Sequence, residues 1–371
     1  MKQIAKIAKS ALALALVGSA SFCAYAQHAD EDKVLNFVNW TDYIGEDTIA
    51  NFEKEYGIKV NYTTLDNNEL LNARLIAGHS GYDLAIPSAT FAKSQIDGGL
   101  LMKLDKTQLP NLRNYDQSIV SKISGGIDPS SNYTASWLWG FNTVGINVAK
   151  VKAALGSDPM PANPMELAFN PKYAAKLKSC GMSFLDSPTE VIPSALLYVG
   201  KEPYSKNPTD YAEALAALKL VRPYVTMFSS STYIDELANG GICVAFGWSG
   251  DFGIARSRAI ERKTGQDIKS FAPEGAVLFS DVMAIPSDAP HPKNALLFIN
   301  YVLRPEVQAA ITNKVKYPNA NQAARKFVSP EILKNSYPTP EEFASMHGSK
   351  QITNEMRKMS NKVYSSFKSG M

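Results

Sequence analysis

The chain has 371 residues, a formal net charge of +3 and 45% hydrophobic residues. A chain of this length exceeds what one hydrophobic core usually organises, so two domains are expected. The near-neutral charge argues against nucleic acid as a partner, because phosphate binding requires a basic surface.

The first 26 residues predict export. Three lysines precede a short apolar run at 11–20, and the small-residue tripeptide at 24–26 is typical of a cleavage site. The apolar run is well short of the roughly 20 residues that cross a bilayer. Cleavage after Ala26 removes three lysines and no acidic residue, so the mature chain has a net charge near zero. We therefore expect a signal peptide at 1–26 and a soluble periplasmic protein.

The cysteines predict one disulfide. Cys23 lies in the signal peptide, and the bulky Phe22 before it argues against lipid attachment there. The other two, Cys180 and Cys243, are expected to pair because disulfides persist outside the cytoplasm. Two buried free thiols are the alternative. The four histidines are scattered without the spacing of zinc ligands, so no metal site is expected.

The segment from Val34 predicts strands that alternate with helices. Asp47 is the expected cap of the first helix and Gly57 its stop, while Asn68 and Gly78 bound the second helix. The predicted strands cover 34–38, 58–65 and 82–86. This βαβαβ order predicts a parallel sheet with helices on its faces. Ligands bind beyond the carboxyl ends of such strands.

A second unit with the same order begins near Pro171. Its predicted elements are helices at 171–178, 211–220 and 234–239, and strands at 180–185 and 242–246. A further strand is predicted at 277–285, and further helices at 294–303 and 355–367. Asp281 lies inside the otherwise apolar strand, where a solvated role is hard to arrange. It is therefore the strongest single candidate for a functional carboxylate.

The sequence carries no motif of a catalytic nucleophile, a zinc site or a phosphate loop, so we expect neither an enzyme nor a cofactor. What recurs is an aromatic residue beside a carboxylate at a strand end: Trp40 with Asp42 and Tyr43, Trp248 with Asp251, and Phe279 with Asp281. Such pairs suit a flexible dication, whose methylenes need flat apolar walls and whose ammonium groups need charge partners. Taken singly, each tryptophan is more often a core residue, and Asp42 is as easily a helix cap.

Five motifs then occur in order along the chain: NWTDYI at 39–44, PSATF at 87–91, FLDSPTE at 184–190, GWSGD at 247–251 and YPNAN at 317–321. Together they resemble the bacterial periplasmic polyamine-binding proteins, above all the putrescine receptors, from about Val34 to Tyr337. The resemblance implies a two-lobed periplasmic binding protein fold of type II. Each α/β lobe would be a mainly parallel sheet flanked by helices, with the ligand in the cleft between the lobes.

The resemblance also implies a domain division and partners. The first lobe would cover 34–136 and about 282–313, and the second about 137–281 and 314–371. The partner would be an inner-membrane ABC transporter permease, to which a monomeric receptor delivers its polyamine. The resemblance supports the pairing of Cys180 with Cys243 as well.

Site residues carry over position by position. The resemblance implies an aromatic box of Trp40, Tyr43, Trp248, Phe279 and Tyr317, ammonium anchors at Asp251 and Asp281, hydrogen bonds from Thr41, Asp42 and Ser88, and a direct or water-mediated role for Glu190. Ser187 stands where spermidine-preferring relatives carry an acid, and Phe279 where they tend to carry tryptophan. Both differences favour a diamine.

Other interpretations stay open at this point. Ser280 replaces an aromatic residue common in the putrescine type, which would loosen the pocket toward cadaverine, agmatine or spermidine. A protein of the same fold could bind another small solute such as a sugar, or report polyamine to a receptor. An exported glycoside hydrolase could use Asp251 and Asp281 as its acid pair.

Overall fold

The computed structural model describes residues 31–65 and 67–370. The signal peptide expected at 1–26, with Cys23, lies outside the described residues. From Lys33 onward, the described residues belong to one compact unit. None of the helices in the described ranges is both long and apolar enough to cross a membrane.

The strands of the described ranges join in the order β2-β1-β3-β9-β4-β7-β5-β6, and β8 pairs with β4. Their bounds are β1 Val34–Trp40, β2 Lys59–Leu65, β3 Leu84–Ala85, β4 Thr134–Asn147, β5 Met182–Phe184, β6 Met227–Phe228, β7 Val244–Trp248, β8 Ile268–Ser270 and β9 Leu278–Ala284.

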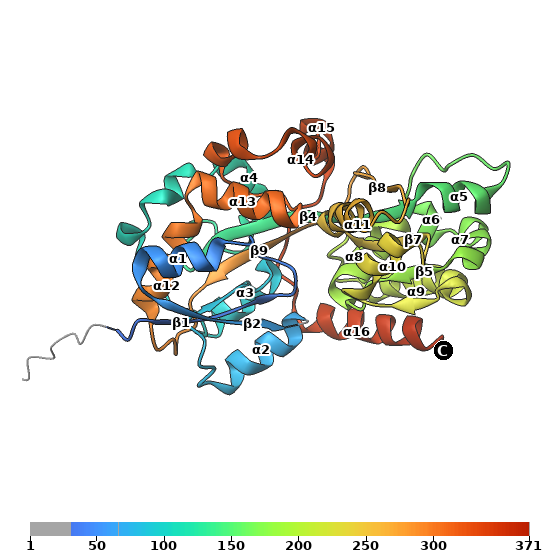
Figure 1. Cartoon of the computed structure of the whole chain (residues 1–371). Helices are drawn as coiled ribbons and strands as arrows, with labels where there is room; N and C mark the ends of the chain where they lie inside the picture. The colour runs from blue at the N-terminus through green and yellow to red at the C-terminus, as the bar shows by residue number, and fades with distance from the viewer. Residues whose placement is uncertain (1–30, 66, 371) are drawn as a thin grey trace, which may run out of the picture. The chain divides into compact units, whose positions relative to one another are not determined.

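The helices surround this sheet (Figure 1). Their bounds are α1 Thr48–Tyr56, α2 Asn68–Ala77, α3 Ala89–Asp97, α4 Gln117–Ser124, α5 Val148–Leu155, α6 Glu166–Phe169, α7 Pro171–Leu177, α8 Pro188–Tyr198, α9 Pro208–Val221, α10 Thr232–Asn239, α11 Ser249–Glu261, α12 Pro292–Val302, α13 Pro305–Val315, α14 Pro330–Asn335, α15 Pro340–Ser345 and α16 Asn354–Ser369.

The predicted βαβαβ unit is present, since β1 pairs in parallel with both β2 and β3. Alternate residues of β1 face opposite sides of the sheet. Phe37 packs in the core with Phe52 of α1, while Val38 packs with Leu71 of α2. The cap of α2 is Asn67, which accepts a hydrogen bond from the backbone of Leu70, so the prediction of Asn68 was one residue late.

Strand β4 joins the two halves of the molecule and was not predicted. It is 14 residues long and buried along its whole length. Its first part pairs with β9, and its last part pairs with β7 and β8. Because both faces of the strand are covered, its sequence lacks the alternation of polar and apolar residues that marks a half-buried strand.

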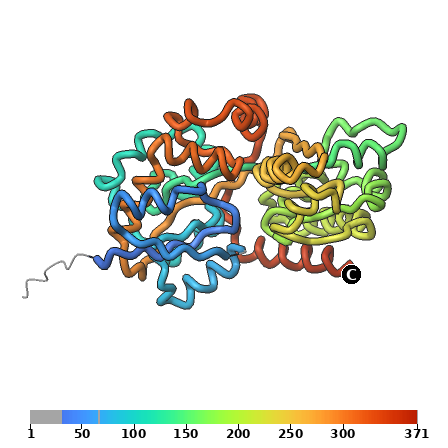
Figure 2. The backbone as a smooth tube through the Cα atoms, viewed as in Figure 1, coloured from blue at the N-terminus to red at the C-terminus, as the bar shows by residue number. Residues whose placement is uncertain are grey.

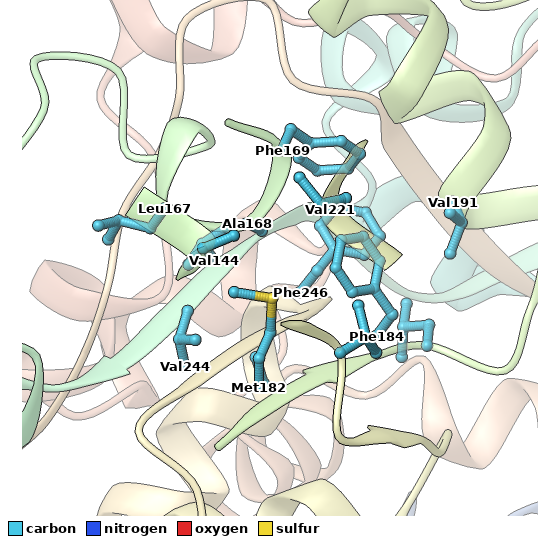
Figure 3. Packing of buried hydrophobic residues seen from close by; sticks show 14 of the residues in the cluster. Val144, Leu167, Ala168, Phe169, Met182, Phe184, Val191, Val221, Val244 and Phe246 are labelled. Carbon is cyan, nitrogen blue, oxygen red and sulfur yellow. The ribbon is translucent and has the colours of Figure 1, made fainter. Parts of the chain in front are cut away.

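Two separate cores define two lobes. The first contains Phe37, Phe52 and Phe298 from the elements around β1. The second contains Phe184 and Phe246, with the other residues labelled in Figure 3: Val144, Leu167, Ala168, Phe169, Met182, Val191, Val221 and Val244. Trp248 packs against both cores, which places it at the boundary between the lobes. The predicted two-lobed α/β fold is therefore confirmed.

The C-terminal part of the chain divides between the lobes (Figure 2). Tyr317, Ala320 and Met346 belong to the first core, whereas Val363 and Phe367 of α16 belong to the second. These contacts favour placing much of 314–346 with the first lobe, which differs from the predicted division. The boundary positions themselves stay a prediction.

Cys180 and Cys243 form a disulfide with an S–S distance of 2.03 Å. Cys180 ends the turn after α7, and Cys243 directly precedes β7. The bond therefore links two segments of the second lobe covalently, and the predicted pairing is confirmed.

Candidate functional site

A cavity of about 390 Å³ opens between the lobes, and every predicted site residue lines it. These residues are Trp40, Thr41, Asp42, Tyr43, Ser88, Glu190, Trp248, Asp251, Phe279, Asp281 and Tyr317. Trp40 is the last residue of β1 and Trp248 the last of β7. The carboxyl ends of strands from both lobes thus meet at one place, as expected for ligand sites in open α/β sheets.

Asp251 lies in the first turn of α11 and is held by two tyrosines. Its carboxylate accepts hydrogen bonds from the hydroxyls of Tyr233, at 2.6 Å, and Tyr317, at 2.5 Å. The side chain is nearly buried. Burial raises the pKa of the Asp251 carboxyl to about 6, and the two hydroxyl groups oppose that shift.

Two glycines beside Trp248 let these tyrosines approach. A Cβ atom on Gly247 would lie 2.6 Å from the Tyr233 hydroxyl oxygen, and one on Gly250 would lie 2.3 Å from the Tyr317 ring. Neither distance is compatible with a side chain. The Gly-Trp-Ser-Gly-Asp motif therefore combines an aromatic wall, an anionic group and the room for the two hydroxyls that orient it.

Asp281 lies in the middle of β9 and is held from the first lobe. Its carboxylate accepts a hydrogen bond of 2.6 Å from the Ser88 hydroxyl. Asn68 bonds the same serine twice, at its hydroxyl and at its backbone N–H, each at 2.9 Å. Burial raises the pKa of the Asp281 carboxyl to about 6. The strand thus presents a carboxylate that is positioned but poorly solvated.

Aromatic rings fill the space near these two carboxylates. The rings of Tyr43 and Tyr317 meet edge to face with centroids 5.1 Å apart, and Phe279 lies 6.0 Å from Tyr317 and 6.5 Å from Trp248. Burial raises the pKa of Tyr43, and the charges of Asp281 and Asp251 both add to the shift. Tyr43 is therefore close to both carboxylates.

Glu190 forms a third anionic position, in the first turn of α8. Its carboxylate accepts a hydrogen bond of 2.8 Å from the side chain of Asn142 on β4. Burial raises the pKa of the Glu190 carboxyl to about 7, with further contributions from the charges of Asp281 and Glu69. The Asn142 hydrogen bond opposes this shift.

All charged side chains among the described residues that line the cavity are acidic. Six carboxylates are among the described lining residues, with no lysine, arginine or histidine: Asp42, Glu69, Asp186, Glu190, Asp251 and Asp281. Asp42 pairs with Arg258, and Asp186 with Lys368. Within the described ranges, no group of three or more carboxylate, histidine or cysteine side chains is placed to hold a metal ion. The arrangement suits an organic cation with an apolar middle.

Several supporting residues were missed by the sequence reasoning. Tyr233, Asn68 and Asn142 orient Asp251, Ser88 and Glu190, but each lies on a different element from the residue it orients. Asn39 is another, because its side chain donates to the Tyr43 carbonyl and shapes the loop after β1. The sequence held one signal for Asn39: it is a polar residue that directly follows the strand predicted at 34–38.

Ser280 does not widen the cavity directly. Its hydroxyl donates to the carbonyl of Ile123, whereas its neighbours Phe279 and Asp281 line the cavity. Successive residues of a strand face opposite sides. The small side chain that was expected to loosen the pocket therefore points away from it.

Residues 47–338 match the family described as bacterial extracellular solute-binding protein. The chain is 43% identical to the putrescine-binding periplasmic protein SpuD of Pseudomonas aeruginosa, over 98% of this chain and 99% of that protein. It is also 43% identical to the putrescine-binding periplasmic protein PotF of Escherichia coli, over 92% and 93% of the two chains.

Solved structures agree with the fold. The TpPotD lipoprotein of Treponema pallidum aligns with a TM-score of 0.76 at 25% identity, covering 90% of this chain and 99% of that one. The spermidine/putrescine ABC transporter substrate-binding protein PotD of Streptococcus pneumoniae aligns with a TM-score of 0.73 at 21% identity, covering 91% and 99%.

Proposed function

This chain belongs to the bacterial extracellular solute-binding protein family, and on that premise we propose that it is a periplasmic receptor that captures putrescine for an ABC permease. The proposal includes removal of the signal peptide at 1–26 and binding without chemical turnover. The relatives SpuD and PotF are named as putrescine-binding periplasmic proteins.

One observation carries the proposal: the cavity has two nearly buried carboxylates, Asp251 and Asp281, with aromatic rings beside them and no basic lining residue in the described chain. A buried ammonium group is costly to bring out of water unless a carboxylate pairs with it. A diamine offers two such groups, and its methylenes can lie on the rings of Trp248, Phe279 and Tyr317.

The site also supports a diamine in preference to a triamine. Ser187 lines the cavity and is neutral, so it offers no carboxylate to a third ammonium group. Phe279 leaves a smaller wall than tryptophan would. We propose that closure of the lobes over the ligand completes its contacts, because residues of both lobes line the same cavity.

The test is isothermal titration calorimetry with putrescine, cadaverine, agmatine and spermidine. The parent protein is expected to bind putrescine most tightly, and Asp281→Asn to weaken it by at least about thirtyfold, because removal of one partner of a buried charge pair costs 2–5 kcal/mol. Asp288→Asn, an exposed change outside the cavity, is the matched control and should bind like the parent. Unchanged putrescine affinity in Asp281→Asn would refute the assignment of the anchors.

A further inference from the structure

Arg357 of α16 does not line the cavity, but it contacts α3, the helix that follows the cavity residue Ser88. Its guanidinium carbon is 4.2 Å from the ring centroid of Phe91 on α3, a cation–π contact. Phe91 is buried and follows Ser88, the partner of Asp281, by three residues. The position of the charge is thus fixed relative to the ligand site by an aromatic ring of the first lobe.

The helix that carries Arg357 is anchored in the second lobe. The Tyr364 hydroxyl donates to the Leu185 carbonyl at 2.8 Å, and Lys368 pairs with Asp186 at 2.8 Å. Leu185 and Asp186 begin the segment that leads to Glu190. Helix α16 is therefore anchored beside the segment that leads to Glu190, and its Arg357 contacts Phe91 on α3 of the first lobe.

Glu69 is the acidic residue whose charge acts on Arg357. It lies in the first turn of α2 and lines the cavity. Burial lowers the pKa of Arg357, and the charge of Glu69 opposes that shift. The charge of Glu69 acts on Glu190 as well, and so does that of Asp281. Geometry agrees with this effect: Asn68, the neighbour of Glu69, hydrogen-bonds Ser88, which precedes by three residues the Phe91 ring that Arg357 contacts.

The groups at this end matter for the length of the ligand. A diamine needs two anchors, which Asp251 and Asp281 supply. A triamine brings a third ammonium group that requires further negative charge, and Glu190 and Glu69 are two further carboxylates that line the cavity. A fixed guanidinium beside them offsets their charge and repels a third cation.

We propose that Arg357 is a specificity-determining residue that selects diamines over triamines by offsetting the charge of Glu69. This inference rests on the proposed function, because it concerns the same cavity and the same class of ligand. Arg357 acts through the electrostatic field and not by contact with the ligand. A purely mechanical role, in which Arg357 only holds the lobes together, would weaken diamine and triamine binding by the same factor.

The test measures the ratio of the dissociation constants for spermidine and putrescine at low salt. In Arg357→Met, which keeps an apolar side chain over Phe91, this ratio is expected to fall by about three- to fivefold, since one charge is removed near an exposed carboxylate. Arg357→Lys should restore the parental ratio. Lys358→Met removes an exposed positive charge from the same helix and should leave the ratio unchanged.

A second parent variant, Glu69→Gln, separates the electrostatic effect of Arg357 on Glu69 from its other effects. In Glu69→Gln, the change Arg357→Met should shift the ratio by less than about twofold, because its partner charge is absent. An unchanged ratio in Arg357→Met, or an equal shift in both backgrounds, overturns the inference while putrescine binding by the parent protein upholds the proposed function. A parent protein that binds no polyamine overturns both.

Discussion

Asp251 and Asp281 are buried and Glu190 is half-buried, so each carboxylate has lost much of its water before a ligand arrives. Each accepts a hydrogen bond from a neutral group: a tyrosine, a serine or an asparagine. These bonds orient the carboxylates but do not neutralise them. The cationic ligand is therefore the group that completes their pairing.

The raised pKa values predict opposite effects of pH on affinity and on stability. Between pH 7.5 and 5, Asp251 and Asp281, with pKa values of about 6, become protonated and lose their attraction for ammonium groups. Putrescine affinity should fall by about a hundredfold, or about tenfold for each carboxylate. Calorimetry across this pH range measures it, and a flat profile would contradict the anchoring role.

The stability of the ligand-free protein should move the other way. A carboxyl whose pKa is higher in the folded than in the unfolded protein binds its proton more tightly in the folded state. Its contribution to the free energy of unfolding is therefore fully present below the unfolded pKa and is lost as pH rises through 6. Asp281→Asn should therefore exceed the ligand-free parent in unfolding free energy at pH 7.5 by up to about 3 kcal/mol. Denaturant unfolding should show that difference vanishing near pH 4.

Helix α11 is the element on which the site depends most. It starts at the end of β7 with Asp251 in its first turn, and its glycines face Tyr317 and Lys316 of the segment after α13. Close contact at Gly250 brings the Tyr317 hydroxyl to Asp251. The lack of a side chain at Gly250 is thus part of the binding geometry.

Gly250→Ala should weaken putrescine binding by about tenfold. The added Cβ would displace the Tyr317 ring, and Asp251 would lose the hydrogen bond from the Tyr317 hydroxyl. A hydrogen bond to a charged group is worth about 1.5–3 kcal/mol. Gly98→Ala adds the same methyl group at the end of α3, where the nearest atom is 3.2 Å away and the backbone is not left-handed, and it is the control. Equal affinities for the two variants would show that Tyr317 does not need this contact.

At the level of the whole molecule, the two lobes are joined by β4 and by an ion pair at the cavity. Asp42, in the loop after β1, pairs at 2.6 Å with Arg258 of α11, which also pairs with Asp235 of α10. Asp42 adopts a left-handed backbone with φ of 55°. That conformation is uncommon for a residue with a side chain, so the surrounding structure must hold it.

Arg258→Met should speed putrescine release and lower affinity by about two- to fivefold, because a partly exposed ion pair between the lobes contributes under about 1 kcal/mol to the closed state. Stopped-flow dissociation at low and high salt measures the effect, which should shrink as salt rises. Arg262→Met removes a charge that pairs with Asp235 inside the second lobe, and it serves as the control. Identical release rates for Arg258→Met and the parent would exclude a role in closure.

Local pattern was enough to place part of the cavity lining, whereas Thr41, Ser88, Glu190 and Tyr317 came from the family resemblance. Trp40, Trp248 and Asp281 could be found because they stand at or inside predicted strands, and the carboxyl ends of such strands converge in any open α/β sheet. The disulfide followed from compartment and cysteine number. These features depend on short stretches of chain whose chemistry is the same wherever they pack.

Contacts between distant segments needed the folded chain. The hydroxyls of Tyr233 and Tyr317 on Asp251, the passage of β4 between the lobes and the docking of α16 on the second lobe all join residues that are far apart in sequence or carry no periodic signal. Periodicity reports which face of an element is apolar, and it does not report which partner covers that face. Packing alone settles the partner, and with it the orientation and charge state of each carboxylate in the cavity.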